Sequence, residues 1–343
     1  MVNEKDMTAR RSSPGRDRLL VGVGSALVDI LTHEDDAFLE AAGALKGGMV
    51  YVDRDHIERT LSRTAGAPAV VPGGSACNTV VGVSRLGGRA RFVGKRGNGV
   101  MGDFFENALR AHNVDPRLFR SETSTGRVLS IITPDAQRSM FTFLGAAAES
   151  RSEDIVAELF QDAAIVHLEG YLLFNPEFMR KALALAKAGG AMVSLDLASF
   201  NVVQESREFL GDLVDRYVDI LLANEDEARA YTGETEPRAA LKALSRGVEI
   251  AALKTGECGS LISGEGRVIT VPAAGDGRPA VDTTGAGDLW AAGFLFGLAE
   301  GYPLEKCGAL GSACGYEVCQ VVGASIPEPG WERIRKLIET QEP

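Results

Sequence analysis

Residues 282–288 read DTTGAGD, and the apolar run LWAAGFLFGLA follows them over residues 289–299. Gly285, Ala286 and Gly287 have almost no side chain, so their backbone N–H groups are unobstructed where the apolar run predicts that a helix begins. Such N–H groups, together with the positive end of a helix, stabilise a bound anion. The stretch therefore predicts an anion-binding turn, although an ordinary capped turn uses the same residue types.

Asp288 ends this stretch and suggests a chemical role for the turn. A carboxylate beside an anion site is electrostatically unfavourable unless it takes part in the chemistry. At this place it is suited to accept a proton from an attacking hydroxyl while the N–H groups stabilise a transferring phosphoryl group. We therefore expect phosphoryl transfer with Asp288 as the general base.

Composition limits the partners of the chain. Its 343 residues are 45% hydrophobic and 24% charged, which suits one large α/β domain or two ordinary ones. The net charge of −11 argues against nucleic acid, so an anionic cosubstrate such as ATP needs local N–H groups and a few cations. The five cysteines and four histidines are scattered, which indicates neither a disulfide framework nor a zinc site.

The sequence also predicts where the protein works. No apolar stretch approaches the roughly 20 residues of a membrane span, and the N-terminus lacks the apolar segment of a signal peptide. We expect a cytoplasmic protein with no membrane partner. Residues 1–18 are expected to form a disordered tail.

The first buried strand is expected over residues 19–30, LLVGVGSALVDI. Gly22 and Gly24 begin to imitate a dinucleotide fingerprint, but Leu27 occupies the place of the third glycine, which disfavours an NAD-dependent oxidoreductase. Asp29 would lie at the carboxyl end of the strand, where open α/β sheets bind their ligands. Asp29 is therefore a candidate substrate ligand, or else the cap of a turn.

A glycine pair precedes the next helix, in PGGSACNTVVGVSRLG over residues 72–87. Asn78 follows Gly74 by four residues, so its amide should project from the first helical turn near a glycine floor. A polar amide beside exposed backbone suits the hydroxyl groups of a sugar.

The rest of the chain alternates between strand and helix patterns. Residues 127–134 and 138–147 predict a hairpin, and from residue 163 strands and helices follow in turn, which indicates a parallel sheet with right-handed crossovers. Helices are expected at about 286–300, 304–320 and 328–340. The fold class is therefore α/β.

Two further motifs carry polar groups. In NEDE, residues 224–227, Asn224 and Glu227 would share a helical face and could order water around Mg²⁺. In LKTGECGSLI, the turn with Thr255, Gly256 and Gly259 could expose backbone to a nucleotide.

Taken together, these motifs resemble the PfkB (ribokinase-like) family of carbohydrate and nucleoside kinases over residues 19–340. The resemblance implies one kinase domain over residues 19–343, with a mainly parallel sheet and a small β lid from about 31–53 and 120–147. It implies ATP and Mg²⁺ as cofactors. Matching positions are Gly73, Gly74 and Asn78 for substrate, Asp29 for sugar hydroxyls, Asn224 and Glu227 for magnesium and phosphate, Lys254, Gly256 and Gly259 for nucleotide, and Gly285, Ala286, Gly287 and Asp288 for anion hole and base.

Within the family, RSMFTFLGAA is similar to a lid strand of adenosine kinases, which implies that Arg138 reaches the phosphates. Phe141, Phe143 and Tyr171 could then offer apolar surface to a purine, although aromatic residues at alternating strand positions more often only pack in the core. Glu169 instead resembles a ribokinase position that contacts a sugar hydroxyl. The resemblance also implies a potassium site beside Asp282 and Ser325.

The expected activity is phosphorylation of the 5′-hydroxyl of adenosine by a monomer or homodimer. One alternative is a kinase of a free sugar such as ribose, fructose or 2-keto-3-deoxygluconate. Another is a catalytically idle module that senses a sugar or nucleotide, which the intact Asp288 and its glycine turn disfavour.

Overall fold

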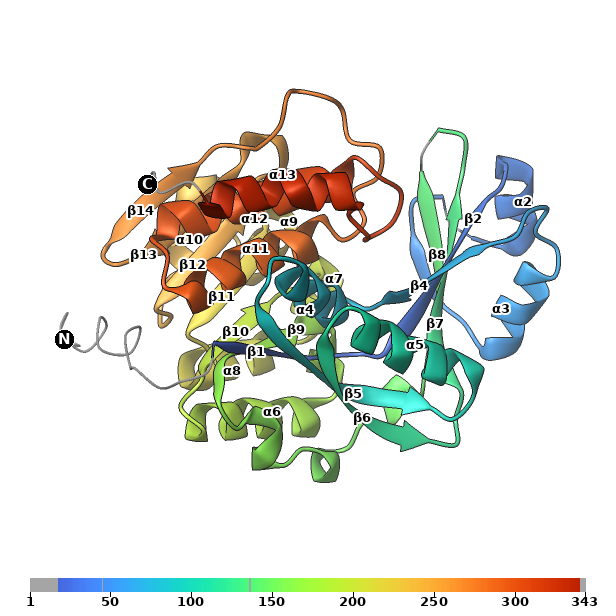
Figure 1. Cartoon of the computed structure of the whole chain (residues 1–343), viewed down its shortest axis with the longest axis horizontal. Coiled ribbons are helices and arrows are strands. Elements are labelled where there is room, and N and C mark those ends of the chain that lie inside the picture. The colour runs from blue at the N-terminus through green and yellow to red at the C-terminus, as the bar shows by residue number, and fades with distance from the viewer. Residues whose placement is uncertain (1–17, 45, 136, 340–343) are drawn as a thin grey trace.

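The computed structural model describes residues 18–44, 46–135 and 137–339, which form a two-part α/β architecture (Figure 1). Apart from Arg18, the tail expected over residues 1–18 lies outside the described residues. None of the helices in the described ranges has the length and apolar character needed to span a membrane.

A nine-stranded sheet forms the larger part, in the order β14-β13-β12-β11-β10-β9-β1-β5-β6. The strands from β12 to β6 are parallel, while β13 is antiparallel to both of its neighbours. Their bounds are β1 Leu19–Val23, β5 Arg89–Gly97, β6 Val114–Ser121, β9 Ala163–Glu169, β10 Met192–Asp196, β11 Ile220–Asn224, β12 Ile250–Lys254, β13 Ser260–Gly264 and β14 Arg267–Val271. This confirms the predicted parallel sheet.

Helices cover both faces of this sheet because apolar side chains of its strands point alternately to either side. One face packs against α4 (Ser75–Arg85), α5 (Val100–Ala111), α11 (Ala286–Glu300), α12 (Leu304–Cys319) and α13 (Glu328–Glu339). The other packs against α6 (Pro176–Ala188), α7 (Phe200–Glu205), α8 (Arg207–Tyr217), α9 (Glu225–Thr232) and α10 (Pro237–Leu244). The last three predicted helices correspond to α11, α12 and α13.

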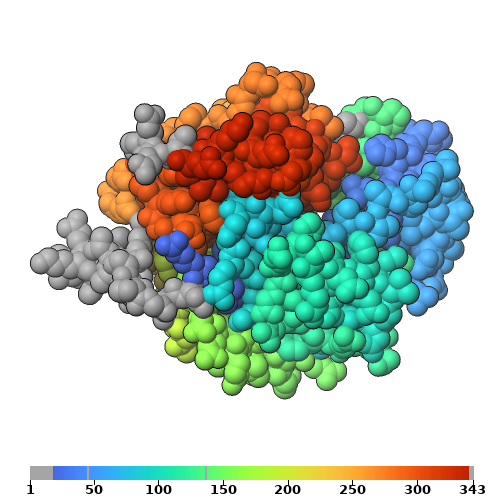
Figure 2. All heavy atoms as spheres, in the orientation of Figure 1, coloured from blue at the N-terminus to red at the C-terminus, as the bar shows by residue number. Residues whose placement is uncertain are grey.

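A five-stranded sheet, the lid, forms the smaller part, in the order β3-β8-β7-β2-β4. Its strands are β2 Leu27–His33, β3 Met49–Tyr51, β4 Ala69–Gly73, β7 Thr125–Ile132 and β8 Arg138–Gly145, with α2 (Asp36–Ala42) and α3 (Arg54–Leu61) beside them (Figure 1). The antiparallel pair β7 and β8 is the predicted hairpin. In Figure 2 the lid is a lobe at one end of the molecule that touches the core.

The predicted single strand over residues 19–30 is wrong, because the chain leaves the large sheet after Val23 and enters the lid at Leu27. Gly24 permits this bend: a Cβ there would lie 2.3 Å from the Glu169 carboxylate and 2.8 Å from the Ala76 side chain. Asp29 therefore belongs to the lid.

Helix α11 is central to the core, since all of its residues from Leu289 to Gly297 are buried. A helix that is apolar on all sides belongs in such a position. It approaches α4 closely, because a Cβ on Gly82 would lie 2.6 Å from the Ala292 Cβ. The first turns of α4 and α11 are thereby held side by side.

Short 3-10 turns complete the described chain: η1 Ala146–Glu149, η2 Ser152–Asp154, η3 Ala157–Phe160, η4 Gly170–Phe174 and η5 Gly256–Cys258.

Candidate active site

A cleft of about 1420 Å³ lies between the lid and the carboxyl ends of the parallel strands. It brings together residues that lie far apart in the sequence. Of the predicted site residues, it is lined by Asp29, Gly74, Asn78, Arg138, Glu169, Asn224, Glu227, Lys254, Gly256, Gly259, Gly285, Ala286, Gly287 and Asp288. Gly73, Thr255 and Asp282 do not line the cleft. Gly73 and Thr255 are next in the sequence to residues that do, and Asp282 accepts a hydrogen bond from the backbone of Thr284, which also lines it.

The predicted anion-binding turn precedes α11. Gly285 caps this helix with φ 72°, a left-handed conformation that glycine adopts without strain. Ala286 N–H donates to the Thr283 carbonyl at 3.2 Å, whereas no described residue accepts from the N–H groups of Gly285, Gly287 or Asp288. Those donors border the cleft and can hold an anion.

Asp288 faces the cleft from the first turn of α11. Its Oδ1 accepts from Ser75 Oγ at 2.7 Å and its Oδ2 accepts from Asn78 Nδ2 at 2.9 Å. Burial raises the pKa of Asp288, although the hydrogen bonds from Asn78 and Ser75 partly oppose this. Its partners are neutral, so the carboxylate is oriented without being neutralised and remains available as a base.

Asp29 reaches the same part of the cleft from lid strand β2, not from the carboxyl end of a strand of the large sheet as predicted. A Cβ on Gly73 would lie 2.3 Å from the Asp29 carboxyl carbon, so the glycine leaves room for this side chain. Burial raises the pKa of Asp29 to about 7, while Arg138 lowers it and Asp288 raises it further. The negative charge of Asp288 therefore affects the pKa of Asp29.

Glu169 ends strand β9 and is buried beneath the cleft. Its Oε1 accepts from Ser25 N–H at 2.8 Å and its Oε2 accepts from Ala76 N–H at 3.0 Å. Burial raises its pKa to about 7. The carboxylate thus joins the β1–β2 connection to the start of α4, and its contact with a substrate hydroxyl stays a prediction.

Arg138 extends from lid strand β8 to the loop before α11, where its Nη1 donates to Thr284 Oγ1. Thr284 Oγ1 in turn donates to Asp282 Oδ1 at 2.6 Å, and Asp282 Oδ2 accepts from Gly323 N–H at 2.8 Å. Asp282 therefore holds the loop in place, and a potassium site beside it stays a prediction. No described carboxylate forms an ion pair with Arg138, so its charge is available to phosphate.

The interpretation of Phe141 and Phe143 as purine contacts is wrong, because neither lines the cleft. In strand β8 alternate side chains face the cleft, and these are Arg138, Met140, Thr142 and Leu144. Phe141 points to the opposite face of the lid, where its ring lies 4.5 Å from that of His56. Tyr171 does line the cleft, and its contact with a purine stays a prediction.

Four neighbouring parallel strands end together at one side of the cleft, where a nucleotide site is predicted. Glu169 pairs with Asp196 in register, and Asn224 pairs with Lys254, so four polar side chains gather at the carboxyl ends of β9 to β12. Lys254 Nζ forms an ion pair with Asp196 Oδ2 at 2.6 Å. A Cβ on Gly287 would lie 3.2 Å from this ammonium, which places the cation beside the predicted anion-binding turn.

Asn224 and Glu227 form a reciprocal capping box at the start of α9. Glu227 N–H donates to Asn224 Oδ1 at 2.9 Å, and Asn224 N–H donates to Glu227 Oε2 at 2.8 Å. Burial and the nearby Asp196 and Asp288 raise the pKa of Glu227, against the effect of Lys254. This excess of negative charge fits a divalent cation that keeps its water shell. No three His, Cys, Asp or Glu side chains of the described ranges form a metal-binding group by themselves.

Sequence reasoning missed Ser75, Asp196 and Tyr316. Asp196 could have been found, because it ends a buried strand pattern as Asn224 does. The contact of Ser75 with Asp288 could not be predicted from the sequence, because it depends on how α4 packs against α11. Tyr316 lines the cleft from α12 and lies 5.9 Å from the guanidinium of Arg278, a pairing between distant segments.

Several known proteins share the sequence pattern or the fold of this chain. The sequence pattern of the pfkB family carbohydrate kinases matches residues 41–331. The structure of a probable sugar kinase from Rhizobium etli CFN 42 superposes with a TM-score of 0.85 at 33% identity, over 92% of this chain and 97% of that one. An adenosine kinase from Sinorhizobium meliloti gives 0.84 at 34% identity, over 92% and 98%. An ATP-dependent 6-phosphofructokinase of Thermoanaerobacterium thermosaccharolyticum is 27% identical over 279 residues, 79% of this chain and 85% of the relative.

Proposed function

Because the chain belongs to the pfkB family of carbohydrate kinases, we propose that it transfers the γ-phosphoryl group of ATP to the 5′-hydroxyl of adenosine. The membership makes the protein a phosphotransferase acting on a sugar or a nucleoside. The choice of adenosine within that class is our proposal.

The apolar acceptor end of the cleft carries this choice. Besides polar groups such as Asp29, Ser130 and Thr142, the lid and the core contribute nine apolar or aromatic side chains to this end of the cleft. These are Leu27, Met49, Tyr51, Val128, Met140, Leu144, Tyr171, Leu172 and Phe174. A free sugar carries hydroxyl groups on nearly all sides and would leave such a wall without a partner, whereas a purine base presents two apolar faces. The likeness to an adenosine kinase at 34% identity also supports the proposal.

Asp288 would take the proton of the 5′-hydroxyl as that oxygen attacks the γ-phosphorus. The N–H groups of Gly285 and Gly287 would bind the phosphoryl oxygens, and Arg138 would add a positive charge from the lid side. Asp29 and Asn78 would hold the ribose hydroxyls, so that the attacking oxygen lies near Asp288. All these groups border one cleft, as such a reaction requires.

Lys254 and Glu227 would serve the phosphate donor. The Lys254 ammonium lies beside the predicted anion-binding turn, where its positive charge would stabilise the negative charge of the β- and γ-phosphates. Mg²⁺ held through water by Glu227 would neutralise phosphate charge when bound.

A substrate panel tests the proposal. ATP consumption is measured with adenosine, inosine, ribose, fructose and 2-keto-3-deoxygluconate at equal concentrations. The proposal expects the highest kcat/KM for adenosine. A higher value for a free sugar would contradict it and would favour the second candidate, a sugar kinase, which the likeness to the Rhizobium etli protein supports.

A further inference from the structure

Arg96 is the largest fully buried side chain of the described residues, with 1% of its surface exposed. It lies near the end of strand β5, outside the cleft. An arginine is always charged and is almost never buried without several partners. Its position therefore needs an explanation.

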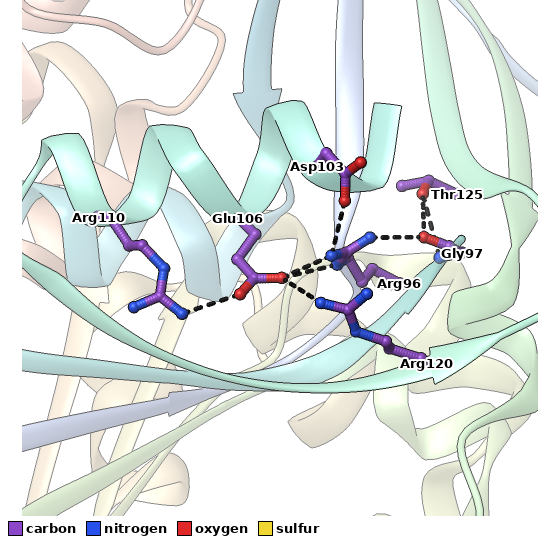
Figure 3. A network of polar contacts seen from close by, with 7 residues as sticks. All are labelled: Arg96, Gly97, Asp103, Glu106, Arg110, Arg120 and Thr125. Atoms are coloured by element: carbon purple, nitrogen blue, oxygen red, sulfur yellow. Dashed lines mark hydrogen bonds and ion pairs between the residues drawn. The ribbon is translucent and has the colours of Figure 1, made fainter. Parts of the chain in front are cut away.

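The guanidinium of Arg96 lies in a polar network that joins three elements (Figure 3). Its Nε and Nη2 donate to Glu106 Oε2 at 3.0 and 2.6 Å, and Nη2 lies 2.8 Å from Asp103 Oδ1, both on α5. Nη1 donates to the Gly97 carbonyl at 3.0 Å. Glu106 also accepts from Arg120 on β6 at 3.4 Å, so β5, α5 and β6 are held together.

The chain that crosses from β6 into the lid packs directly on this point. Gly97 N–H donates to Thr125 Oγ1 at 3.1 Å, at the first residue of lid strand β7. A Cβ on Gly97 would lie 2.3 Å from the Thr123 carbonyl oxygen. A Cβ on Gly102 would lie 2.1 Å from the Gly97 carbonyl oxygen and 2.7 Å from Arg96 Nη1. The backbone at Gly97 therefore packs tightly against both the 123–125 segment and the first turn of α5, with the side chains of Arg96 and Thr125 in the same contact.

The return crossing, from β8 back to the core, is held at the same place. Ala146 N–H donates to the Ser124 carbonyl at 2.9 Å, and Lys95 Nζ donates to the Glu149 carbonyl at 2.7 Å. The Glu149 carboxylate accepts from the hydroxyl groups of Ser121 and Thr123. Both ends of the β7–β8 hairpin are thus attached beside the end of β5.

We propose that Arg96 is a positioning residue, which fixes the base of the β7–β8 hairpin and thereby sets where Arg138 and the apolar wall of the lid meet the bound acceptor. Arg96 touches no substrate and acts through Gly97 and Thr125. Hairpin residues on the cleft side include Val128, Arg138 and Met140, so a shift at the base displaces groups at both the phosphate and the acceptor. The inference requires a kinase with this lid but does not depend on adenosine being the acceptor.

The kinetic test compares Arg96→Met with Arg110→Met. Arg110 bonds the same Glu106 at 2.8 Å but is 59% exposed and does not reach Gly97, so it is a matched control. A misplacement of about 1 Å costs roughly 10²-fold in rate. For Arg96→Met we expect kcat/KM for the acceptor to fall by about that factor, with a much smaller change in KM for ATP, because apart from Arg138 the groups assigned to ATP belong to the core. Arg96→Lys should not rescue it, since a single ammonium cannot reproduce the forked contacts.

A second measurement needs no substrate and separates this inference from the proposed function. Hydrogen exchange at the backbone amides of β7 and β8 should speed up in Arg96→Met relative to the exchange in β9 to β12, and should stay unchanged in Arg110→Met. If Arg96→Met does not fold, Thr125→Val removes the Gly97 contact without changing charge and should give the same pattern. Normal kinetics, or an equal loss of protection throughout the molecule, would overturn the proposal.

Discussion

Asn78 Nδ2 donates a hydrogen bond to Asp288 Oδ2 at 2.9 Å, although 210 positions separate the two residues in the sequence. The contact joins the first turn of α4 to the first turn of α11, and the two helices approach closely through Gly82. A neutral donor orients the carboxylate while leaving its charge in place. This relationship makes the protonation of Asp288 sensitive to residue 78.

Asn78→Asp should raise the pKa of Asp288 further, because a second carboxylate at this distance disfavours the ionised form. The acid limb of the pH profile of kcat/KM should move to higher pH by about one unit or more. Asn78→Ser, which adds no charge but loses the hydrogen bond that lowers the pKa of Asp288, should lower kcat/KM and move that limb in the same direction by a smaller amount. An unshifted limb in Asn78→Asp would mean that Asp288 is not the group whose ionisation the profile reports.

Arg138→Gln should reduce kcat by about 10²- to 10³-fold, the usual cost of removing one donor from a developing anion. Arg138→Lys should recover part of the loss, since it restores the charge but not the planar fork. Steady-state kinetics with saturating ATP and acceptor give both values. Equal kcat in the wild type and in Arg138→Gln would show that the lid arginine does not reach the phosphoryl group.

Glu227→Gln should raise the Mg²⁺ concentration needed for half-maximal activity by about tenfold or more, because it removes a buried negative charge near Asp196 and Asp288. Glu225→Gln is the matched control, since Glu225 lies in the same helical turn but is exposed. A titration with Mg²⁺ at fixed ATP measures the effect. Equal Mg²⁺ requirements in the two variants would contradict the assignment of Glu227.

Asp29 should contribute to the stability of the ligand-free protein a part that falls as pH rises between about 4 and 7, while His167, whose pKa burial lowers to about 4, contributes in the opposite direction. The pKa of Asp29 is about 7 in the folded protein against the ordinary 3.8, so the folded state binds the proton more tightly across this range and loses that advantage as pH rises. Each such group contributes at most about 1.4 kcal/mol per pH unit.

Urea unfolding at several pH values checks this in wild type and in Asp29→Asn. The variant should be more stable than the wild type at neutral pH, and its slope should be smaller but not zero, because burial also raises the pKa of Glu169 to about 7. An unchanged slope in Asp29→Asn would contradict the prediction.

Much of the large sheet could be predicted, because buried parallel strands and amphipathic helices follow periodic patterns. The residues at strand ends, such as Asn224 and Lys254, followed from the same patterns and from short motifs. The path of residues 19–33 could not be predicted in this way. One apolar run enters two sheets there, and the bend at Gly24 is decided by its contact with Glu169, far away in the sequence.

The side-chain contacts of the site could not be predicted from the sequence either. Ser75 lies beside Asp288 only because α4 packs on α11, and the choice of Met140 over Phe141 as a cleft residue depends on which face of β8 the core covers. Periodicity gives the alternation along a strand but not which of its two faces meets the ligand.

A direct measurement of the proton acceptor is the single-turnover rate of Asp288→Asn with ATP and the preferred acceptor of the panel, together with the Kd for ATP. The amide is nearly the same size but cannot accept the proton, so the rate should fall by at least about 10²- to 10⁴-fold while the Kd stays within about a factor of three. A rate near that of the wild type would contradict the central claim that the carboxylate at the start of α11 activates the acceptor hydroxyl.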